Sequence, residues 1–375
     1  KKIMNILKDV YNAESVYLCT MCDGPMNHFH IQLIPRYSFE KRGSKNFVKP
    51  RFEYKEDKEK LLELRKQLNY KVGEYNEKSC ASTSINWFPG HMAKTRRQIT
   101  EDLKLIDVVV ELLDARIPIS SQNPEIAQIT NGKKKIIVLN KCDLSDEKEN
   151  QKWVNYFNKK QIPVVLVDSN TGKGIENCLK QIENIMQEDL EKHAQKGRIG
   201  RKIKVMVLGI PNVGKSSFIN RIAKKTSAGV GNKPGVTKQK QWIRVNEKVE
   251  LLDTPGVLWP KFESNEVALN LAFTGTIKES VLETTEVAYY LLKFLIENYM
   301  QNLCEKYKLD ESYVKEILAR DLPENENIYE IMLQIGKKRG CIVSGGNVDD
   351  EKTAKIILDE FKNGKLGKIT IEGVR

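Results

Sequence analysis

Short apolar runs alternate with amphipathic stretches through the middle of the chain. Apolar runs of this length predict buried parallel strands, and apolar positions every three or four residues predict helices. The predicted strands are residues 106–113, 135–139, 164–167, 203–208 and 249–252. The predicted helices between them are residues 146–159, 175–191 and 217–222. This alternation indicates an α/β fold with a doubly wound parallel sheet, whose ligand loops follow the carboxyl ends of the strands.

The two ends of the chain follow other patterns. Residues 27–35 alternate with period two, as expected of a half-buried strand. Beyond residue 276 the pattern is helical, with apolar faces at 283–298, 314–319, 328–339 and 351–361. We therefore expect four parts: an α+β segment (1–70), a linker (71–84), an α/β domain (85–275) and an all-α domain (276–375).

Composition narrows the possible classes of protein. The chain has 375 residues, with 40% hydrophobic and 30% charged residues and a net charge of +12. No stretch reaches the ~18 uncharged apolar residues that cross a bilayer, so we expect no membrane partner. The scattered cysteines and the lack of a secretory signal suggest a reduced, cytoplasmic protein. The positive charge suits a polyanion such as RNA, although it could simply solvate the surface. Oligomeric state is left open.

A glycine-rich motif, G-x-x-x-x-G-K-S, lies between a predicted strand and a predicted helix at residues 209–216. In that setting its backbone N–H groups cradle phosphate, the lysine reaches the terminal phosphates and the serine hydroxyl holds Mg²⁺. The alternative is a glycine-rich turn that matches by chance. The expected nucleotide contacts in this phosphate loop are Pro211, Asn212, Val213, Gly214, Lys215, Ser216 and Ser217.

The motif Asn-Lys-x-Asp at residues 140–143 is typical of guanine recognition. The Asp143 carboxylate can accept hydrogen bonds from both guanine N1–H and N2–H₂, which adenine lacks. Lys141 is expected to stack over the base, and Asn140 to tie this loop to the phosphate loop. Ser169 and Asn170 follow the next strand and resemble a second base-contacting loop. The predicted ligand is therefore GTP.

Two further motifs fit the switch segments of a GTPase. Thr237 and Asp253 would complete the Mg²⁺ shell begun by Ser216, and the Gly256 N–H would sense the γ-phosphate. The guanine motif precedes the phosphate loop, which reverses the usual order. The same sheet can form if the chain is circularly permuted. The second switch then runs directly into the C-terminal helices.

These motifs, in this order, resemble the YlqF family of bacterial ribosome biogenesis GTPases. The likeness extends to Trp-Phe-Pro-Gly-His-Met at 87–92, Asp-Ala-Arg-Ile-Pro at 114–118, and Asn212. The resemblance covers the chain from about residue 85 onward. It implies an assembly factor for the large ribosomal subunit that binds the precursor particle and its rRNA, and that is released when GTP is hydrolysed to GDP and phosphate.

Catalysis needs a group that orients water, because Val257 stands where many GTPases have glutamine. His91 is the candidate and matches the catalytic histidine of the resembled family; the alternative is that it caps the following helix. It would act beside Lys215, Thr237 and Gly256. The resemblance also implies that Asn212 helps to bind K⁺, the alternative being an ordinary loop residue.

Basic residues gather at 192–204, at 337–339 and at Lys362, Lys365 and Lys368. The family resemblance favours contacts with rRNA phosphates, especially through residues 364–369. Solvation and the complementing of helix dipoles explain the same lysines equally well.

The period-two strand carries His28, His30 and Gln32 on one face. It resembles the nucleotidyl-transferase branch of the histidine-triad (HIT) family, in which the middle histidine, here His30, is the nucleophile. One alternative is a truncated or vestigial half-domain without a working active site. Another is a zinc site formed by Cys19 and Cys22 with the two histidines. Two rival functions follow: a nucleotidyl hydrolase or transferase that uses His30, and a non-catalytic RNA-binding scaffold that holds GTP as a structural ligand.

Overall fold

The structure is a computed structural model that forms two compact units, Lys1–Ser84 and Ile85–Arg375. The described residues are 8, 15–23, 28–36, 91–197, 200–226, 242–252, 254, 256, 258–259, 262, 264, 265–277, 283–343 and 345–374. At 15–23, 28–36, 91–96 and 224–226 the description covers the backbone alone.

The first unit contains an antiparallel pair, β1 (Ser15–Asp23) and β2 (His28–Arg36). Strand β2 confirms the strand predicted over 27–35, whereas β1 was not predicted. The register sets His30 opposite Met21 and His28 opposite Asp23. The side chains of the histidines, Gln32 and the two cysteines lie outside the described residues. The HIT resemblance and the zinc alternative therefore stay predictions.

A six-stranded sheet in the order β5-β4-β3-β6-β8-β7 forms the centre of the second unit. Its strands are β3 (Val108–Asp114), β4 (Lys134–Asn140), β5 (Val164–Val167), β6 (Ile203–Gly209), β7 (Trp242–Arg244) and β8 (Val249–Leu252). All neighbours pair in parallel except β7 and β8. The prediction of a wholly parallel sheet was therefore wrong at this edge. Residues 245–248 alone link β7 to β8, which is too short for the crossover that a parallel pair needs.

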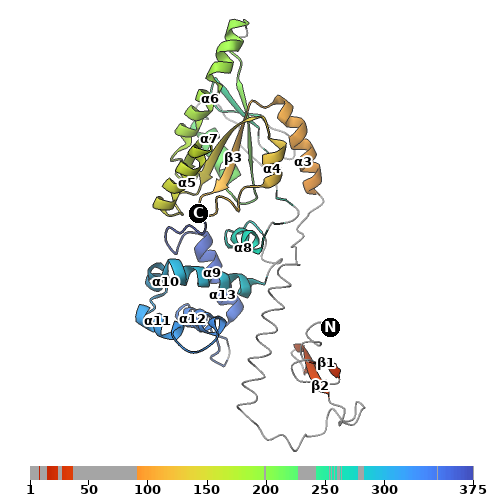
Figure 1. The fold of residues 1–375 in the computed structure, drawn as a ribbon, viewed down its shortest axis with the longest axis vertical. Helices are drawn as coiled ribbons and strands as arrows, with labels where there is room; N and C mark the ends of the chain where they lie inside the picture. The colour runs from red at the N-terminus through yellow and green to blue at the C-terminus, as the bar shows by residue number, and fades with distance from the viewer. Residues whose placement is uncertain are drawn as a thin grey trace, which may run out of the picture. The chain divides into compact units, whose positions relative to one another are not determined.

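Helices cover both faces of this sheet, as a doubly wound fold requires (Figure 1). The helices are α3 (His91–Asp102), α4 (Pro124–Ile129), α5 (Glu147–Lys159), α6 (Ile175–Gln195) and α7 (Lys215–Thr226), with a short 3₁₀ turn η3 (Leu103–Leu105) after α3. Because strand side chains alternate, Val108, Val110 and Leu112 pack in one cluster with α6 and α7. Val109 packs on the other face with α3 and α4, and Leu113 packs with α5.

The C-terminal third is helical, as predicted. Its helices are α8 (Asn265–Phe273), α9 (Thr284–Asn298), α10 (Met300–Tyr307), α11 (Glu311–Leu318), α12 (Glu324–Lys338) and α13 (Asp350–Lys362). They enclose an apolar core of their own. Helix α8 joins the two cores, because Ala268 and Leu271 pack with the sheet while Ala272 and Phe273 pack with the helices. None of the described helices is long and apolar enough to cross a membrane.

The last residues, 364–374, return to the sheet, and we call them the C-terminal tail. In Figure 1 the C-terminus lies between the sheet and the helical region. The Ile369 N–H donates to Leu144 O (3.0 Å), and the Ile371 N–H donates to Arg116 O (2.9 Å). The Glu372 carboxylate accepts from the Ile119 N–H at 2.7 Å. These bonds fasten the helical region to loops that leave the sheet, a contact the sequence patterns did not predict.

The turn before α6 requires glycine. Gly174 has φ of +85°, and a Cβ there would lie 2.0 Å from the backbone oxygen of Leu166 in β5. Gly132 has a similar φ of +79° with nothing within 4 Å of the same position. We expect Gly132→Ala to cost about 1–2 kcal/mol of unfolding free energy, the cost of the left-handed backbone alone. Gly174→Ala should cost more than about 3 kcal/mol, because β5 must also move. Urea denaturation of both variants would test this difference, and equal losses would contradict it.

Candidate nucleotide-binding site

The loops that carry the predicted motifs leave the same edge of the sheet. In the strand register, Asp114 at the end of β3 pairs with Asn140 at the end of β4, and Asn140 pairs with Val167 at the end of β5. Strand β6 ends at Gly209, which is level with Leu112 of β3. Parallel pairing therefore brings the guanine-type motif, the Ser169 loop and the phosphate loop together at the carboxyl ends of the strands.

The side chain of Asn140 connects these loops. It is buried, and its Nδ2 donates to Val213 O of the phosphate loop at 2.8 Å. Its Oδ1 accepts from the Ser169 hydroxyl at 2.7 Å. The expected link between the guanine-type motif and the phosphate loop is thus present in the geometry. One amide therefore bonds two other segments, which sets the distance between the guanine-type motif, the Ser169 loop and the phosphate loop.

Lys141 lies over the phosphate loop in a left-handed backbone conformation, with φ of +60°. Its Nζ donates to the backbone oxygen of Asn212 at 2.8 Å and lies 3.0 Å from Asp114 Oδ2. Both ends of this lysine are therefore held: its backbone by the turn after β4, and its ammonium by the phosphate loop and a buried carboxylate.

Asp143 has the properties expected of a ligand-binding carboxylate. Its Oδ1 is buried and has no hydrogen-bond partner among the described residues. Burial raises the pKa of the Asp143 carboxyl group above its ordinary value, and the nearby Asp168 carboxylate adds to the rise. A buried acceptor without a donor is costly, so a ligand with N–H groups would relieve that cost.

The phosphate loop has the tight geometry that its glycines imply. Gly214 has φ of +99°, and a Cβ there would lie 2.3 Å from Asn140 Nδ2. A Cβ on Gly256 would lie 2.9 Å from Lys215 Nζ and 3.1 Å from Pro211 Cα. The glycine of the second switch motif therefore lies against the phosphate loop and its lysine. Ser216 and Ser217 are exposed at the start of α7.

Asn212 makes a contact that was not predicted. Its Nδ2 donates to the backbone oxygen of Gly275, just after α8, at 2.6 Å. Like Lys141, it has a positive φ, here +58°. The residue expected to help bind K⁺ therefore also touches the segment that leads to the helical region.

Other predicted site residues are less completely described. Thr237, Asp253 and Val257 lie outside the described residues, and His91 is described only as the first residue of α3. Asn170 is exposed, and its backbone N–H donates to Asp168 Oδ1 at 2.8 Å. The roles proposed for these residues stay predictions.

Sequence reasoning assigned no contact to three residues around the site, although Asp114 and Arg116 belong to the motif at 114–118 that supported the family resemblance. Asp114 binds Lys141, Arg116 binds Asp114 at 2.8 Å, and Arg221 Nε of α7 donates to Ser169 O at 3.2 Å. A signal for Asp114 was available, because it follows a buried strand just as Asn140 does. The arginines could not be placed without knowing which segments pack against them.

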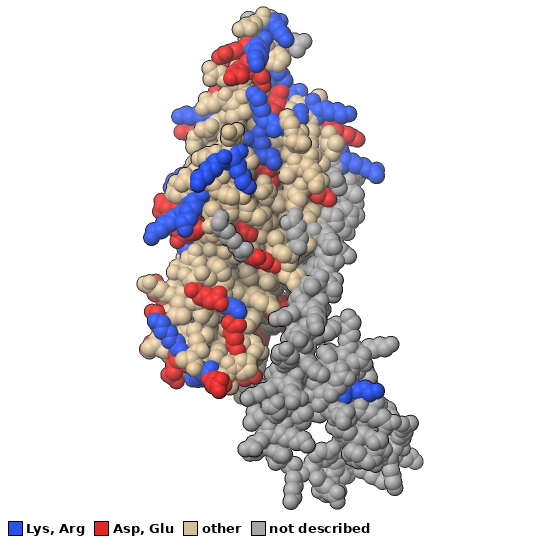
Figure 2. All heavy atoms as spheres, in the orientation of Figure 1, with Lys and Arg blue, Asp and Glu red and all other residues tan. Residues whose placement is uncertain are grey.

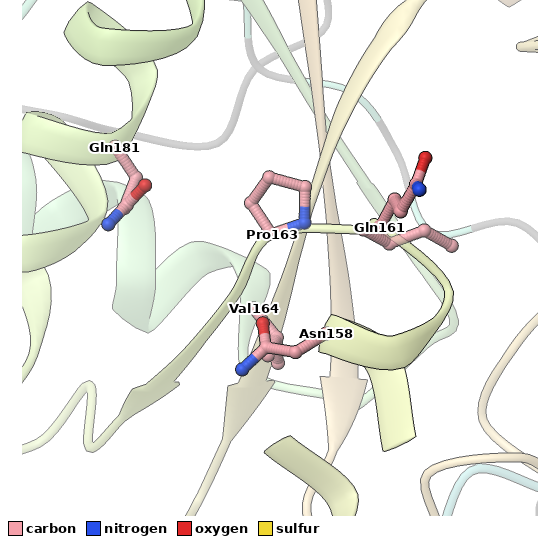
Figure 3. Close-up of a pocket in the computed structure, with 6 residues that line it drawn as sticks. Asn158, Gln161, Pro163, Val164 and Gln181 are labelled. Carbon is pink, nitrogen blue, oxygen red and sulfur yellow. The ribbon is translucent and has the colours of Figure 1, made fainter. Parts of the chain in front are cut away.

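The hollow in Figure 3 is a different feature. It is lined by residues that include Asn158, Gln161, Pro163, Val164 and Gln181. Val164 begins β5, so this hollow lies at the amino end of the strand, whereas the predicted motifs follow the carboxyl ends. It has no part in the candidate site.

The fold and the converging motifs define a GTPase of the phosphate-loop class, and similarity to known proteins agrees. The family model "50S ribosome-binding GTPase" matches residues 204–329. Ribosome biogenesis GTPase A of Bacillus cereus is 46% identical over 77% of this chain and 93% of its own length. The Thermotoga maritima protein of that name is 31% identical over 77% of this chain and 94% of its own. The chain belongs to the ribosome biogenesis GTPase A family.

A solved structure of a relative supports the fold. The GNP-bound crystal structure of YlqF from T. maritima matches with a TM-score of 0.52 and 26% identity, over 75% of this chain and 98% of that one. The family assignment confirms that the chain is a GTP-hydrolysing enzyme with a role in ribosome assembly. It confirms the predicted family. It does not test the resemblance of the first segment to the HIT family, which stays a prediction.

The bridging role of Asn140 can be tested by its removal. Asn140→Ala loses hydrogen bonds to two loops of the site, each worth ~1–1.5 kcal/mol, so GDP affinity should fall roughly thirtyfold or more. Asn123→Ala is the matched control: Asn123 is equally buried, but its Oδ1 caps α4 by accepting from the Glu125 N–H at 2.9 Å. The control should lose stability while keeping GDP affinity within about twofold. Titration with a fluorescent GDP analogue measures both, and similar affinities for the two variants would contradict the bridging role.

Proposed function

We propose that this GTPase acts on a precursor of the large ribosomal subunit, binds its rRNA in the GTP state and leaves after hydrolysis. Its role as a GTPase of ribosome assembly follows from the family. We propose three further points: that the particle is a large-subunit precursor, that the protein contacts its rRNA, and that GTP hydrolysis releases the protein. They rest on the relatives' family description, "50S ribosome-binding GTPase", and on the nucleotide site.

The nucleotide assignment depends on the buried Oδ1 of Asp143, which has no hydrogen-bond partner among the residues that the structure describes. It lies in the loop that Asn140 ties to the phosphate loop, as a carboxylate that reads guanine must. Guanine N1–H and N2–H₂ would supply the missing donors, each as a charge-assisted bond of ~1.5–3 kcal/mol. Lys141, held over the phosphate loop, would cover one face of the base.

At the phosphate end, Lys215 and the backbone N–H groups of residues 212–217 would bind the β- and γ-phosphates. Ser216, Thr237 and Asp253 would hold Mg²⁺, which neutralises charge on those phosphates when bound. The approach of Gly256 to Lys215 supports this arrangement, because it brings the second switch motif beside the lysine that we expect to reach the terminal phosphate.

For hydrolysis we propose that His91 orients the attacking water and that K⁺ bound through Asn212 supplies positive charge near the transferred phosphoryl group. His91 begins α3, which packs against the sheet through Ile99. The Nδ2 of Asn212 points at Gly275, so its Oδ1 is the atom that would serve a cation.

Single-turnover hydrolysis separates these two roles. His91→Ala should slow GTP cleavage by about 10²–10⁴ with little change in GTP affinity, because it would remove a group that acts only in the transition state. In wild-type protein, replacing K⁺ by Na⁺ should slow cleavage, and Asn212→Ala should abolish that difference. Equal rates in both salts would remove the K⁺ proposal. An unchanged rate for His91→Ala would remove the histidine proposal.

The proposed rRNA surface is the helical region. Lys337, Lys338, Lys365 and Lys368 are exposed there, while Arg339 pairs with Glu360 at 2.6 Å. On the face seen in Figure 2, Lys and Arg side chains gather over the sheet region, and the helical region carries fewer. The positive charge on this face is therefore greater over the sheet region than over the helical region. Binding through the four exposed lysines should weaken as salt rises.

Sedimentation with ribosomal particles tests the proposal. A non-hydrolysable GTP analogue should carry the protein into the precursor large-subunit fraction, and GDP should leave it in the supernatant. Particles should also speed GTP turnover, which distinguishes an enzyme from a passive scaffold. Asp143→Asn provides the control, because its amide N–H suits the 2-oxo group of xanthine: this variant should sediment with an XTP analogue instead of the GTP analogue. Sedimentation that ignores the nucleotide would contradict the proposal.

The HIT-like segment is separable from this function. Any nucleotidyl activity run by His30 should disappear in His30→Ala while GTP hydrolysis remains, and Lys215→Ala should do the reverse.

A further inference from the structure

Asp114 and Arg116 form an ion pair beneath the nucleotide loops. Their side chains are 2% and 1% exposed, and Arg116 Nη2 lies 2.8 Å from Asp114 Oδ2. A second bond joins Arg116 Nε to Asp114 Oδ1 at 2.9 Å, so the contact is bidentate. This geometry fixes the plane of the carboxylate.

The carboxylate has a second cationic partner in the site itself. Lys141 Nζ lies 3.0 Å from Asp114 Oδ2 and donates to Asn212 O at 2.8 Å. A lysine ammonium is a compact charge on a flexible stem, so its place depends on the acceptors around it. Asp114 is the charged acceptor that holds this ammonium against the phosphate loop.

Arg116 extends the contact to the helical region. Its Nη1 donates to the backbone oxygens of Phe361 (3.3 Å) and Lys362 (3.2 Å) at the end of α13. Its guanidinium also lies over the Phe361 ring, 5.2 Å from the centroid. The carbonyls that end a helix favour a cation, so the C-terminus of α13 holds Arg116 in place.

The charges support each other. Burial alone would raise the pKa of the Asp114 carboxyl group, but Arg116 and Lys141 outweigh burial and hold the pKa well below its ordinary value. Asp114 is therefore ionised at neutral pH and remains the partner of both cations.

We propose that Asp114 is a positioning residue for Lys141 in guanine-nucleotide binding, and that Arg116 sets Asp114 against the C-terminal end of α13. This inference rests on the nucleotide site proposed above. Its consequence is that nucleotide affinity depends on the docked end of α13, although no residue of α13 belongs to the site.

The same two strands offer a matched comparison. Glu111 of β3 and Lys135 of β4 form another carboxylate–lysine pair, at 2.9 Å, with Glu111 1% exposed. Glu111 lies three residues before Asp114, and therefore on the opposite face of β3. Breaking that pair removes a buried ion pair from the same strands without touching Lys141.

The test is a double-mutant cycle on GDP affinity. Asp114→Asn should weaken GDP binding about tenfold in the wild-type background, the loss of one charge-assisted contact. In the Lys141→Met background, which keeps the stem and removes the ammonium, the same change should alter affinity by less than about twofold. Arg116→Gln should weaken binding to a similar degree and should add little to Asp114→Asn. Glu111→Gln should lower the melting temperature while leaving GDP affinity unchanged.

Circular dichroism checks that each variant is folded. If Asp114→Asn alone does not fold, because Arg116 is left buried and unpaired, the charge-balanced Asp114→Asn/Arg116→Gln variant takes its place in the cycle. An equal loss with and without the Lys141 ammonium, or no loss at all, overturns the inference. If Lys141→Met and Asp143→Asn themselves leave GDP affinity unchanged, the proposed site fails as well, and the two failures are thereby distinguished.

Discussion

One buried amide, that of Asn140, sets the geometry on which the nucleotide site depends. Its donor bonds the phosphate loop and its acceptor bonds Ser169, so the ends of β4, β5 and β6 are held at one spacing. Such a group tolerates few alternatives, because an unpaired buried polar atom costs more than a hydrogen bond normally contributes. The close approach at Gly214 shows how little room remains around it. This amide thereby joins the loop of the guanine-type motif to the phosphate loop.

A second constraint joins the site to the helical region. Arg116 bonds the end of α13, Asn212 bonds Gly275, and the C-terminal tail bonds Leu144 just beyond Asp143. Gly364 allows this approach, because a Cβ there would lie 2.5 Å from Leu144 Cδ2. The helical region is therefore fastened to both the base end and the phosphate end of the site. These hydrogen bonds join the loops of the candidate site directly to the helical region.

Much of the candidate site could be predicted because its chemistry is local in sequence. A phosphate loop needs glycines at fixed offsets, and a guanine-reading loop needs its asparagine, lysine and aspartate within four positions. The apolar runs that predict strands then placed both motifs at the carboxyl ends of those strands. The pairing of Asp114 with Asn140 in the strand register agrees with this placement. The antiparallel edge strand β7 was missed because three residues carry too little pattern to reveal a direction. The helices α4, α8 and α10 were not predicted because each is too short to show a clear helical repeat of apolar residues.

From the amino-acid sequence alone we could predict the class of fold, the family and the candidate nucleotide contacts, because each is encoded in a short stretch whose spacing has one physical use. The long-range contacts that hold those residues in place could be identified only in the folded structure. In the sequence, Asp114 and Arg116 only mark the end of a predicted strand. In the structure, a helix more than two hundred residues away, α13, supplies the carbonyl oxygens that accept from Arg116. In the sequence, the C-terminal tail was notable only for its basic residues at 364–369. In the structure, the backbone N–H groups of Ile369 and Ile371 donate to loops that leave the sheet. Burial and long-range hydrogen-bond partners depend on how the whole chain packs, so a local sequence pattern cannot predict them.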